Sequence, residues 1–288
     1  MGMAYDPRRT VLYTPESQDT LFQGGRVYSP VQIAVEAARL AYYRAEKSLD
    51  QTQRLTEALD RANFGAPMMF VDVATGAAGF GSLRDADGVA VLALRGSQPD
   101  DVADIAHDLT ANIVEWGDTG GHVHAGFAAA TRALLPKIRQ WLKSTHLDPE
   151  KLIVTGHSLG AAMATLVASV MRSQWLVTLG SPRVGDTDFI ATIKAANIRR
   201  IVDCCDAVTE VPPPLFGYTH LSTCTYITRD AQVLQDPVSS VIDADRMEAR
   251  REYVMTYAWR IGAVLLRDLA DHAPINYARA FFADPRCA

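Results

Sequence analysis

Short apolar runs alternate with helical patterns along most of the chain. Residues 89–94 are all apolar, which is typical of a central strand that is covered on both faces. The same analysis predicts further strands at residues 152–155, 175–179 and 199–202 and, between them, helices at about residues 158–172 and 186–196. Strands that alternate with helices indicate βα units. The pattern therefore predicts an α/β fold with a mostly parallel central sheet flanked by helices.

The two ends of the chain have other patterns. Residues 1–28 are polar and contain Pro7 and Pro15, so we expect an irregular segment on the surface. Ser29 and Pro30 form a helix start, and the spacing after them predicts one or two helices to about residue 59. Further predicted elements are strands at residues 68–73, 77–83 and 223–228, a turn at 85–88, and helices at about 98–109, 124–141 and 245–270.

A Gly-X-Ser-X-Gly motif follows the strand at residues 152–155. Gly156, Ser158 and Gly160 stand between that strand and a helical pattern rich in small residues. This context is typical of a serine presented on a sharp strand-to-helix turn, where the two glycines let the backbone pass close to itself. We therefore interpret Ser158 as a nucleophile.

Composition limits the other possibilities. The 288 residues carry a net charge of −5 and no Lys/Arg-rich run, which argues against nucleic acid as a partner. Arg260 and Arg267 interrupt the last apolar stretch, so we expect no transmembrane segment. The four cysteines suggest neither a disulfide framework nor, with the histidines, a zinc site. We expect one domain over residues 1–288, no metal or organic cofactor, and, since no signal peptide is visible, a cytoplasmic location, with secretion as the alternative.

A serine nucleophile needs a base and an acid that orients the base. Where an α/β sheet presents a serine on such a turn, the acid and then the histidine follow it in the chain, which leaves His220 and His272 as candidates for the base. Position favours His272, in a loop after a long helix, while a structural hydrogen bond is the alternative for His220. Asp203 and Asp206 both lie at the end of the strand at residues 199–202, and both stay open as the acid.

The reaction also needs donors for an oxyanion. The backbone N–H of Leu159, directly after the nucleophile, is one candidate. Ser97, which follows the strand at residues 89–94, is the other, through its N–H and its hydroxyl.

Six separated segments together resemble the class 3 lipase family, also called the fungal lipase-like family. They appear in the family's order and cover roughly residues 65–275. The segments are Leu94-Arg95-Gly96-Ser97, Val123-His124-Ala125-Gly126-Phe127, residues 154–162 around Ser158, residues 178–185, Asp206-Ala207-Val208 with Val211-Pro212-Pro213, and Asp271-His272.

The resemblance implies an α/β-hydrolase fold and a Ser-His-Asp triad made of Ser158, His272 and Asp206. It implies a structural role for His220, and packing or loop-bracing roles for His124, His157 and Arg183. The implied function is hydrolysis of carboxylic esters, in the manner of a triacylglycerol lipase, through an acyl-enzyme. Phospholipase A1 or a toxin-like intracellular lipase is the alternative, and a non-catalytic binding protein on a lipase scaffold is a more distant one.

The lid region departs from well-known members of the family. Residues 98–122 match the lid, and their first twelve residues contain four aspartates and only Val102, Ile105 and Leu109 as sizeable apolar residues. Such a helix offers a lipid surface little apolar area, at about 25 cal/mol per Å² buried. We therefore expect weak interfacial activation, transient lipid contact at most, and a preference for short- or medium-chain esters.

Overall fold

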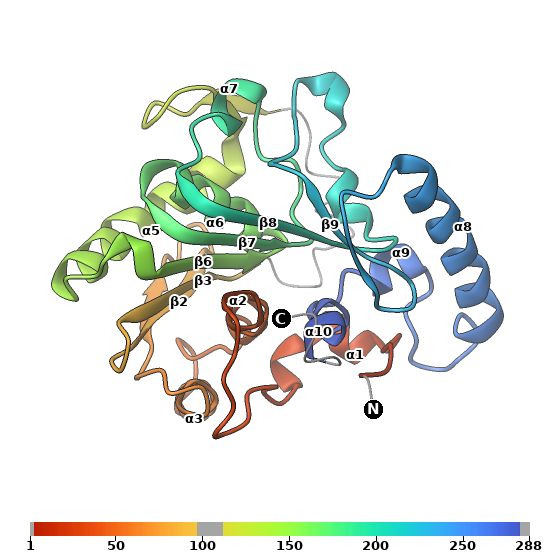
Figure 1. The fold of residues 1–288 in the computed structure, drawn as a ribbon, viewed down its shortest axis with the longest axis horizontal. Helices are drawn as coiled ribbons and strands as arrows, with labels where there is room; N and C mark the ends of the chain where they lie inside the picture. The colour runs from red at the N-terminus through yellow and green to blue at the C-terminus, as the bar shows by residue number, and fades with distance from the viewer. Residues whose placement is uncertain (1–2, 97–111, 283–288) are drawn as a thin grey trace.

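A computed structural model describes residues 3–96 and 112–282 of the chain. Its centre is an eight-stranded sheet in the order β1-β2-β3-β6-β7-β8-β9-β10 (Figure 1). In chain order these strands are β1 (Met68–Val71), β2 (Ala78–Arg84), β3 (Val89–Leu94), β6 (Leu152–His157), β7 (Ser173–Leu179), β8 (Ala195–Asp203), β9 (Cys224–Ile227) and β10 (Val233–Gln235). The five strands from β3 to β9 pair in parallel, and the outer strands pair antiparallel.

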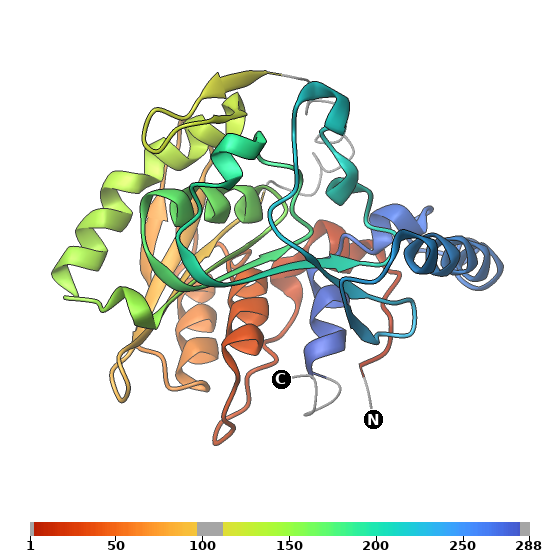
Figure 2. The ribbon, with the colours of Figure 1, turned by 45° about the horizontal axis from the view of Figure 1, so that its top comes forward.

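Helices cover both faces of the sheet (Figure 2). One layer contains α2 (Pro30–Leu40), α3 (Leu49–Asp60) and α10 (Pro274–Phe282), and the other contains α5 (Ala125–Ser144) and α6 (Leu159–Val170). Successive residues of one strand serve opposite layers, since Val91 packs with the first and Leu92 with the second. The run of apolar residues in β3 is therefore buried on both faces, as the sequence predicts.

Several local predictions are confirmed. Ser29 caps α2 in a capping box with Gln32, and Pro30 is the first helical residue. Residues 30–60 form two helices, and β1, β2, β3, β6 and β9 lie where strands are predicted. The turn at residues 85–88 joins β2 to β3.

The helix predicted at residues 186–196 is wrong over most of its length. α7 (Thr187–Ile190) is one turn, and Ala195 and Ala196 already belong to β8. Ala195 lies opposite Ser173 of β7, so sheet pairing outweighs the helical preference of alanine there.

The single helix predicted at residues 245–270 is also wrong. The structure has α8 (Ser239–Thr256), a turn, and α9 (Arg267–Ala270). Gly262, with φ of 84°, lets the chain reverse, and the Tyr253 hydroxyl donates to the Val264 carbonyl at 2.6 Å. Tyr253 and Val264 are buried, but Val254, Ile261 and Leu265, which the helical spacing would place in the core, are exposed.

The N-terminal segment is less irregular than predicted. α1 (Arg9–Tyr13) is helical, and its Val11 and Leu12 are buried against Tyr253, Val264 and Ala273. Two apolar residues are too few to give a periodic signal, so tertiary contacts decide this helix.

The lid region lies partly outside the described residues. Ser97 and residues 98–111 are outside, so the helix predicted there cannot be compared. The rest of the region contains β4 (Ile113–Glu115) and the start of β5 (His122–His124), which pair with each other. Within the described ranges the three cysteines are free, and no helix combines the length and hydropathy needed to cross a bilayer.

Candidate functional site

The turn between β6 and α6 holds Ser158 in a strained conformation. Its φ is 58° and its ψ is −128°, a backbone region that L-residues seldom adopt. The Ser158 N–H donates to the Leu179 carbonyl at 3.0 Å, and the Ser158 carbonyl accepts from Ala161 and Ala162. These bonds fix the turn to the end of β7 and to the first turn of α6.

The two glycines of the motif are required by backbone contact. A Cβ at Gly156 would lie 2.2 Å from the Gly160 carbonyl oxygen, and a Cβ at Gly160 would lie 2.1 Å from the Leu94 carbonyl oxygen. Both distances are far below van der Waals contact. The turn therefore brings β3, β6 and α6 closer together than any side chain permits.

We expect Gly160→Ala to lower the free energy of unfolding by about 3 kcal/mol or more, because backbone must move to admit the methyl group. Urea denaturation measures the loss. Gly24→Ala is the matched control, since a Cβ at Gly24 meets nothing within 4 Å. Equal midpoints for the two variants would contradict the close packing of the turn.

Asp206 and His272 form a buried pair. Asp206 follows β8 and caps a short 3₁₀ turn, and His272 lies between α9 and α10. The distance from His272 Nδ1 to Asp206 Oδ2 is 2.8 Å, and both side chains are almost fully buried. The Tyr277 hydroxyl donates to the same oxygen, and the Val208 N–H donates to Oδ1 at 2.9 Å. The carboxylate is thus fixed by three donors. The other ring nitrogen of His272, Nε2, takes no part in this pair.

The pair lies beside the serine turn. A Cβ placed on Gly180, the residue after β7, would lie 2.8 Å from Asp206 Oδ2 and 3.2 Å from His272 Cε1. The rings of His157 and His272 have centroids 4.5 Å apart, and His157 directly precedes Ser158. Ser158 Oγ and His272 Nε2 are both buried, and neither has a hydrogen-bond partner among the described residues. In enzymes without substrate, catalytic hydrogen bonds are often long and tighten only on binding.

The other two candidates lie in different surroundings. Asp203 is buried opposite Arg279, with 3.5 Å between Oδ1 and Nη2, and burial raises the pKa of its carboxyl well above the usual range. His220 lines a cavity of about 190 Å³ with Arg183 and Arg200. Burial, followed by the charges of these arginines, lowers the pKa of His220 to about 2. Within the described part of the chain, no hydrogen bond joins His220 to either aspartate.

The predicted oxyanion donors are only partly described. Leu159 is the first residue of α6, and N–H groups in the first turn of a helix have no partner within it. Ser97 lies outside the described residues. Gly96, the residue before it, is close to the serine turn, because a Cβ there would lie 3.1 Å from Ser158 Cβ.

A buried ionic cluster that the sequence analysis missed supports the loops of Asp206 and His272. Asp271 Oδ2 accepts from Arg267 Nε at 3.1 Å and from the Cys205 N–H at 2.9 Å, and its Oδ1 accepts from the Tyr5 hydroxyl at 2.7 Å. Burial raises the pKa of Asp271, and the nearby Arg267 opposes that shift. Asp271 precedes His272 and Cys205 precedes Asp206, so the cluster ties the two loops together. The position of Asp271 directly before His272 was the one signal of this cluster in the sequence.

Cys204, Cys205 and Asp271 also come within 4.8 Å of one another. Both oxygens of Asp271 already accept hydrogen bonds from the cluster. A hydrogen bond with Cys205, followed by burial, raises the pKa of the Cys204 thiol, which disfavours the thiolate that a metal would need. This arrangement fits a hydrogen-bonded support better than a metal centre.

We expect Arg267→Met to lower the free energy of unfolding by about 3–5 kcal/mol, because it leaves the Asp271 carboxylate buried without its counter-ion. Thermal unfolding should show a melting temperature roughly 10 °C lower. Arg251→Met is the control, since Arg251 pairs with Glu248 on the surface. If both variants melt together, the cluster does not support the fold.

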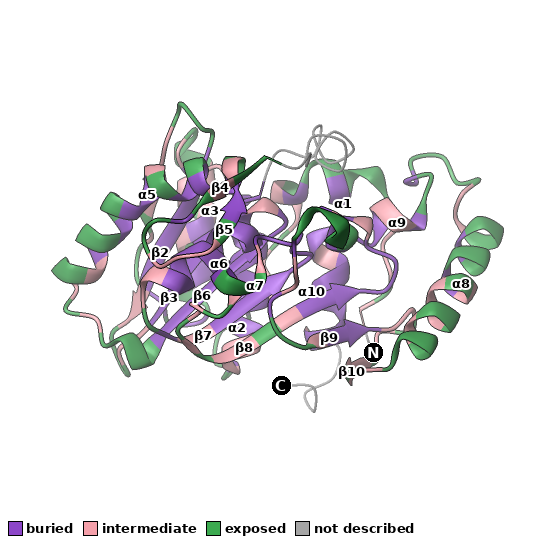
Figure 3. Cartoon of the chain, turned by 90° about the horizontal axis from the view of Figure 1, so that it is seen from above, coloured by how far each residue is buried: buried purple, intermediate pink, exposed green. Residues whose placement is uncertain are grey.

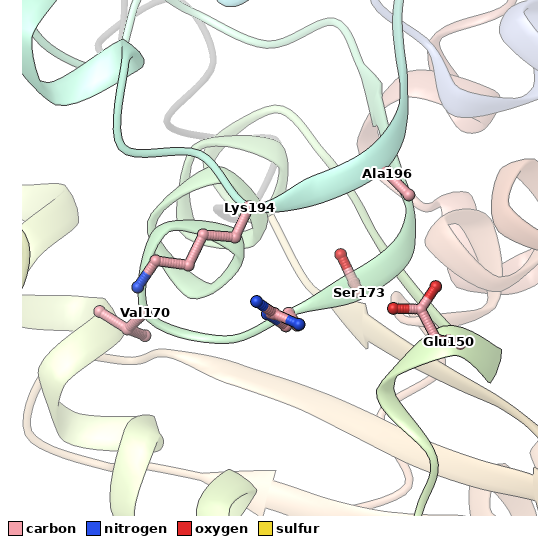
Figure 4. A pocket seen from close by; sticks show the side chains of 6 residues that line it. Glu150, Val170, Ser173, Lys194 and Ala196 are labelled. Carbon is pink, nitrogen blue, oxygen red and sulfur yellow. The ribbon is translucent and has the colours of Figure 1, made fainter.

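A cavity of about 550 Å³ lies where β7 and β8 begin, at the end of the strands opposite to the end that carries Ser158 (Figure 4). Six residues line it: Glu150, Val170, Arg172, Ser173, Lys194 and Ala196. Ser158 follows the other end of β6, so this cavity is separate from the serine turn and contains none of the predicted site residues. We assign it no part in the reaction.

Comparison with known proteins supports the family resemblance seen in the sequence. Residues 91–216 match the family described as lipase (class 3). Secreted mono- and diacylglycerol lipase 1 of Fusarium solani is 38% identical over 112 residues, which cover 36% of this chain and 33% of that protein. Secreted mono- and diacylglycerol lipase A of Penicillium cyclopium is 33% identical over 182 residues, covering 59% of each. The chain thus spans between a third and three fifths of the length of these relatives.

Solved structures support the fold. The structure of Rhizomucor miehei triacylglyceride lipase matches with a TM-score of 0.61 at 20% identity, covering 86% of this chain and 95% of that one. Lipase II from Rhizopus niveus matches with a TM-score of 0.56 at 24% identity, covering 69% and 79%. The α/β-hydrolase fold predicted from the sequence is confirmed.

Proposed function

We propose that the chain belongs to the class 3 lipase family, which its residues 91–216 match, and that it is a serine hydrolase of carboxylic esters. One observation carries the proposal. The Asp206–His272 pair is buried beside a strained turn that holds a serine, and the turn follows the carboxyl end of a central parallel strand. Ligands of open α/β sheets bind at that edge.

The proposed reaction uses an acyl-enzyme. Ser158 Oγ attacks the ester carbonyl carbon while His272 Nε2 takes the hydroxyl proton, and Asp206 accepts the Nδ1–H and stabilises the imidazolium. The N–H groups of Leu159 and Ser97 hold the oxyanion, with the Ser97 hydroxyl as a third donor. The alcohol leaves with the proton from His272. Water then gives its proton to His272, attacks the acyl carbon, and releases the carboxylic acid as Ser158 regains its hydrogen.

We propose short- to medium-chain esters as preferred substrates, on the basis of the polar residues 98–109. Hydrolysis of p-nitrophenyl butyrate should exceed that of the palmitate ester by about tenfold in kcat/KM, because each additional methylene has little apolar lid to contact. A chain-length series measures this. A sharp increase in rate as tributyrin or the palmitate ester passes its solubility limit would contradict the weak interfacial activation proposed with it.

A phospholipase A1, or a toxin-like intracellular lipase, is the second candidate. Phospholipase A(1) DAD1 of Arabidopsis thaliana is 34% identical over 85 residues, 26% of this chain and 19% of that protein. Acyl release from phosphatidylcholine compared with release from tributyrin distinguishes the two. The more distant candidate, a non-catalytic binding protein, predicts no labelling of the folded chain by a fluorophosphonate probe.

The compartment and the domain organisation remain proposals. The names of two relatives include the word secreted, so secretion stands beside the intracellular location predicted from the sequence. Comparing medium and lysate of cells that express the chain decides between them. We also propose one domain over residues 1–288, supported by the hydrogen bonds of Tyr5 to Asp271 and of Asp6 to Asn276.

A further inference from the structure

Residues 253–266 comprise the last residues of α8 and the stretch that joins it to α9, and we call them the apolar turn. Their fourteen positions contain one charged residue, Arg260, and one hydroxyl residue outside the tyrosines, Thr256. Six large apolar side chains of the turn have more than half of their surface exposed, from 51% at Val254 to full exposure at Ile261. The other four are Met255, Trp259, Leu265 and Leu266. Exposed apolar groups concentrated in one short segment usually mark a binding surface.

The exposure is imposed by an ordered backbone. The Gly262 carbonyl accepts from the Arg9 N–H at 2.7 Å, and the Val264 N–H donates to the Pro7 carbonyl at 2.8 Å. The Trp259 indole donates to the Val254 carbonyl at 2.6 Å. The turn is thus held on its inner side, and its apolar side chains point outward from a fixed support.

The turn adjoins the segment that carries His272. Its buried residues Tyr253 and Val264 pack in one cluster with Ala270 and Ala273, which flank His272 in the chain. Figure 3 shows the stretch between α8 and α9 on the outside of the molecule, with exposed residues in green. A surface bound to this turn would therefore lie next to the proposed catalytic edge.

From this we infer that the apolar turn docks the protein on the surface of a lipid substrate, an inference that rests on the proposed ester hydrolysis. Tryptophan, aliphatic residues and arginine are the combination that binds a membrane interface. The positive charge of the turn also fits an anionic lipid surface, since Arg260 is its one charged group. The Arg260 Cζ lies over the Tyr257 ring, 4.8 Å from the ring centroid. A fully exposed Ile261 at the tip suits a fluid lipid surface, which needs no matching hollow, better than it suits a second copy of the chain.

The test measures docking separately from catalysis. We expect the full chain to co-sediment with vesicles of phosphatidylcholine that contain some phosphatidylglycerol, and I261E/L265E to partition about tenfold more weakly. Val27→Glu with Val73→Glu is the matched control, since these valines are 98% and 93% exposed on other segments. The control should partition as the wild type does. About tenfold less I261E/L265E than wild type should be bound to tributyrin droplets, while the rate of the variant on soluble p-nitrophenyl acetate stays unchanged.

A second measurement does not depend on a charged variant. The emission spectrum of Trp259 is obtained by subtracting the spectrum of Trp259→Phe from that of the wild type. Its maximum should shift to shorter wavelength when vesicles are added. Absence of that shift, or equal partitioning of I261E/L265E and the wild type, overturns the inference. A concentration-dependent dimer that I261E/L265E abolishes would also overturn it and assign the turn to self-association. Vesicle binding with no hydrolysis of any ester would leave docking in place and reject the proposed function.

Discussion

Ser158→Ala is expected to lower kcat/KM for p-nitrophenyl butyrate by about 10⁴- to 10⁶-fold and to abolish labelling by a fluorophosphonate probe. The proposed mechanism has no other atom that can carry the acyl group. Because the Ser158 hydroxyl has no hydrogen-bond partner among the described residues, removing it should leave the backbone and the melting temperature nearly unchanged. Initial rates and mass spectrometry of the labelled protein measure the two effects.

Ser144→Ala is the control for this experiment, since Ser144 ends α5 on the surface and its hydroxyl contacts only the Trp141 carbonyl among the described residues. It should retain both activity and labelling. Labelling of Ser158→Ala at another serine would show that the nucleophile has been misassigned. A folded wild-type chain that neither labels nor hydrolyses any ester would favour the binding-protein alternative.

Asp206→Asn is expected to lower kcat by about 10⁴-fold with little change in KM. The amide is nearly isosteric, but it can offer an N–H where His272 Nδ1 needs an acceptor, and the imidazole would then carry its proton on Nε2. That tautomer cannot take the proton from Ser158. Loss of the carboxylate also removes the acceptor of the Tyr277 hydroxyl. Steady-state kinetics over a range of pH measures the effect.

Asp230→Asn is the matched control for Asp206, since Asp230 is exposed and its nearest ionic partner is Arg229 at 3.7 Å. It should hydrolyse esters at the wild-type rate. A companion variant, Asp203→Asn, separates the two acids that the sequence left open. If Asp203→Asn rather than Asp206→Asn removes turnover in a folded protein, the assignment of the acid is wrong.

Local patterns predicted the centre of the fold well. β3 is buried on both faces and apolar without interruption, and the buried strand before Ser158 begins with three apolar residues, so both can be recognised from a few residues. Gly156 is required by a contact with Gly160, which is close in sequence, whereas Gly160 is required by a contact with Leu94 on β3. The position of Asp206 after a strand carried a usable signal, but that signal could not separate it from Asp203.

Tertiary contacts decided the parts that were missed. Tyr5 and Tyr277 act through partners that are 266 and 71 residues away, and no periodicity marks such residues. The spacing in residues 245–270 is helical in form, yet Gly262 reverses the chain and exposes half of the residues that spacing would bury. Sequence pattern alone cannot distinguish an apolar side chain that faces the core from one held outward by a turn.

The hydrogen bond between Tyr5 and Asp271 has a consequence for biosynthesis. These residues are 266 positions apart, so a ribosome must have made the chain past residue 271 before they can meet. The loop of His272 therefore acquires its support last, and a nascent chain cannot become active while the earlier strands are folding. Activity should appear only after residue 272 has left the ribosome, when the central sheet is already resistant to proteases.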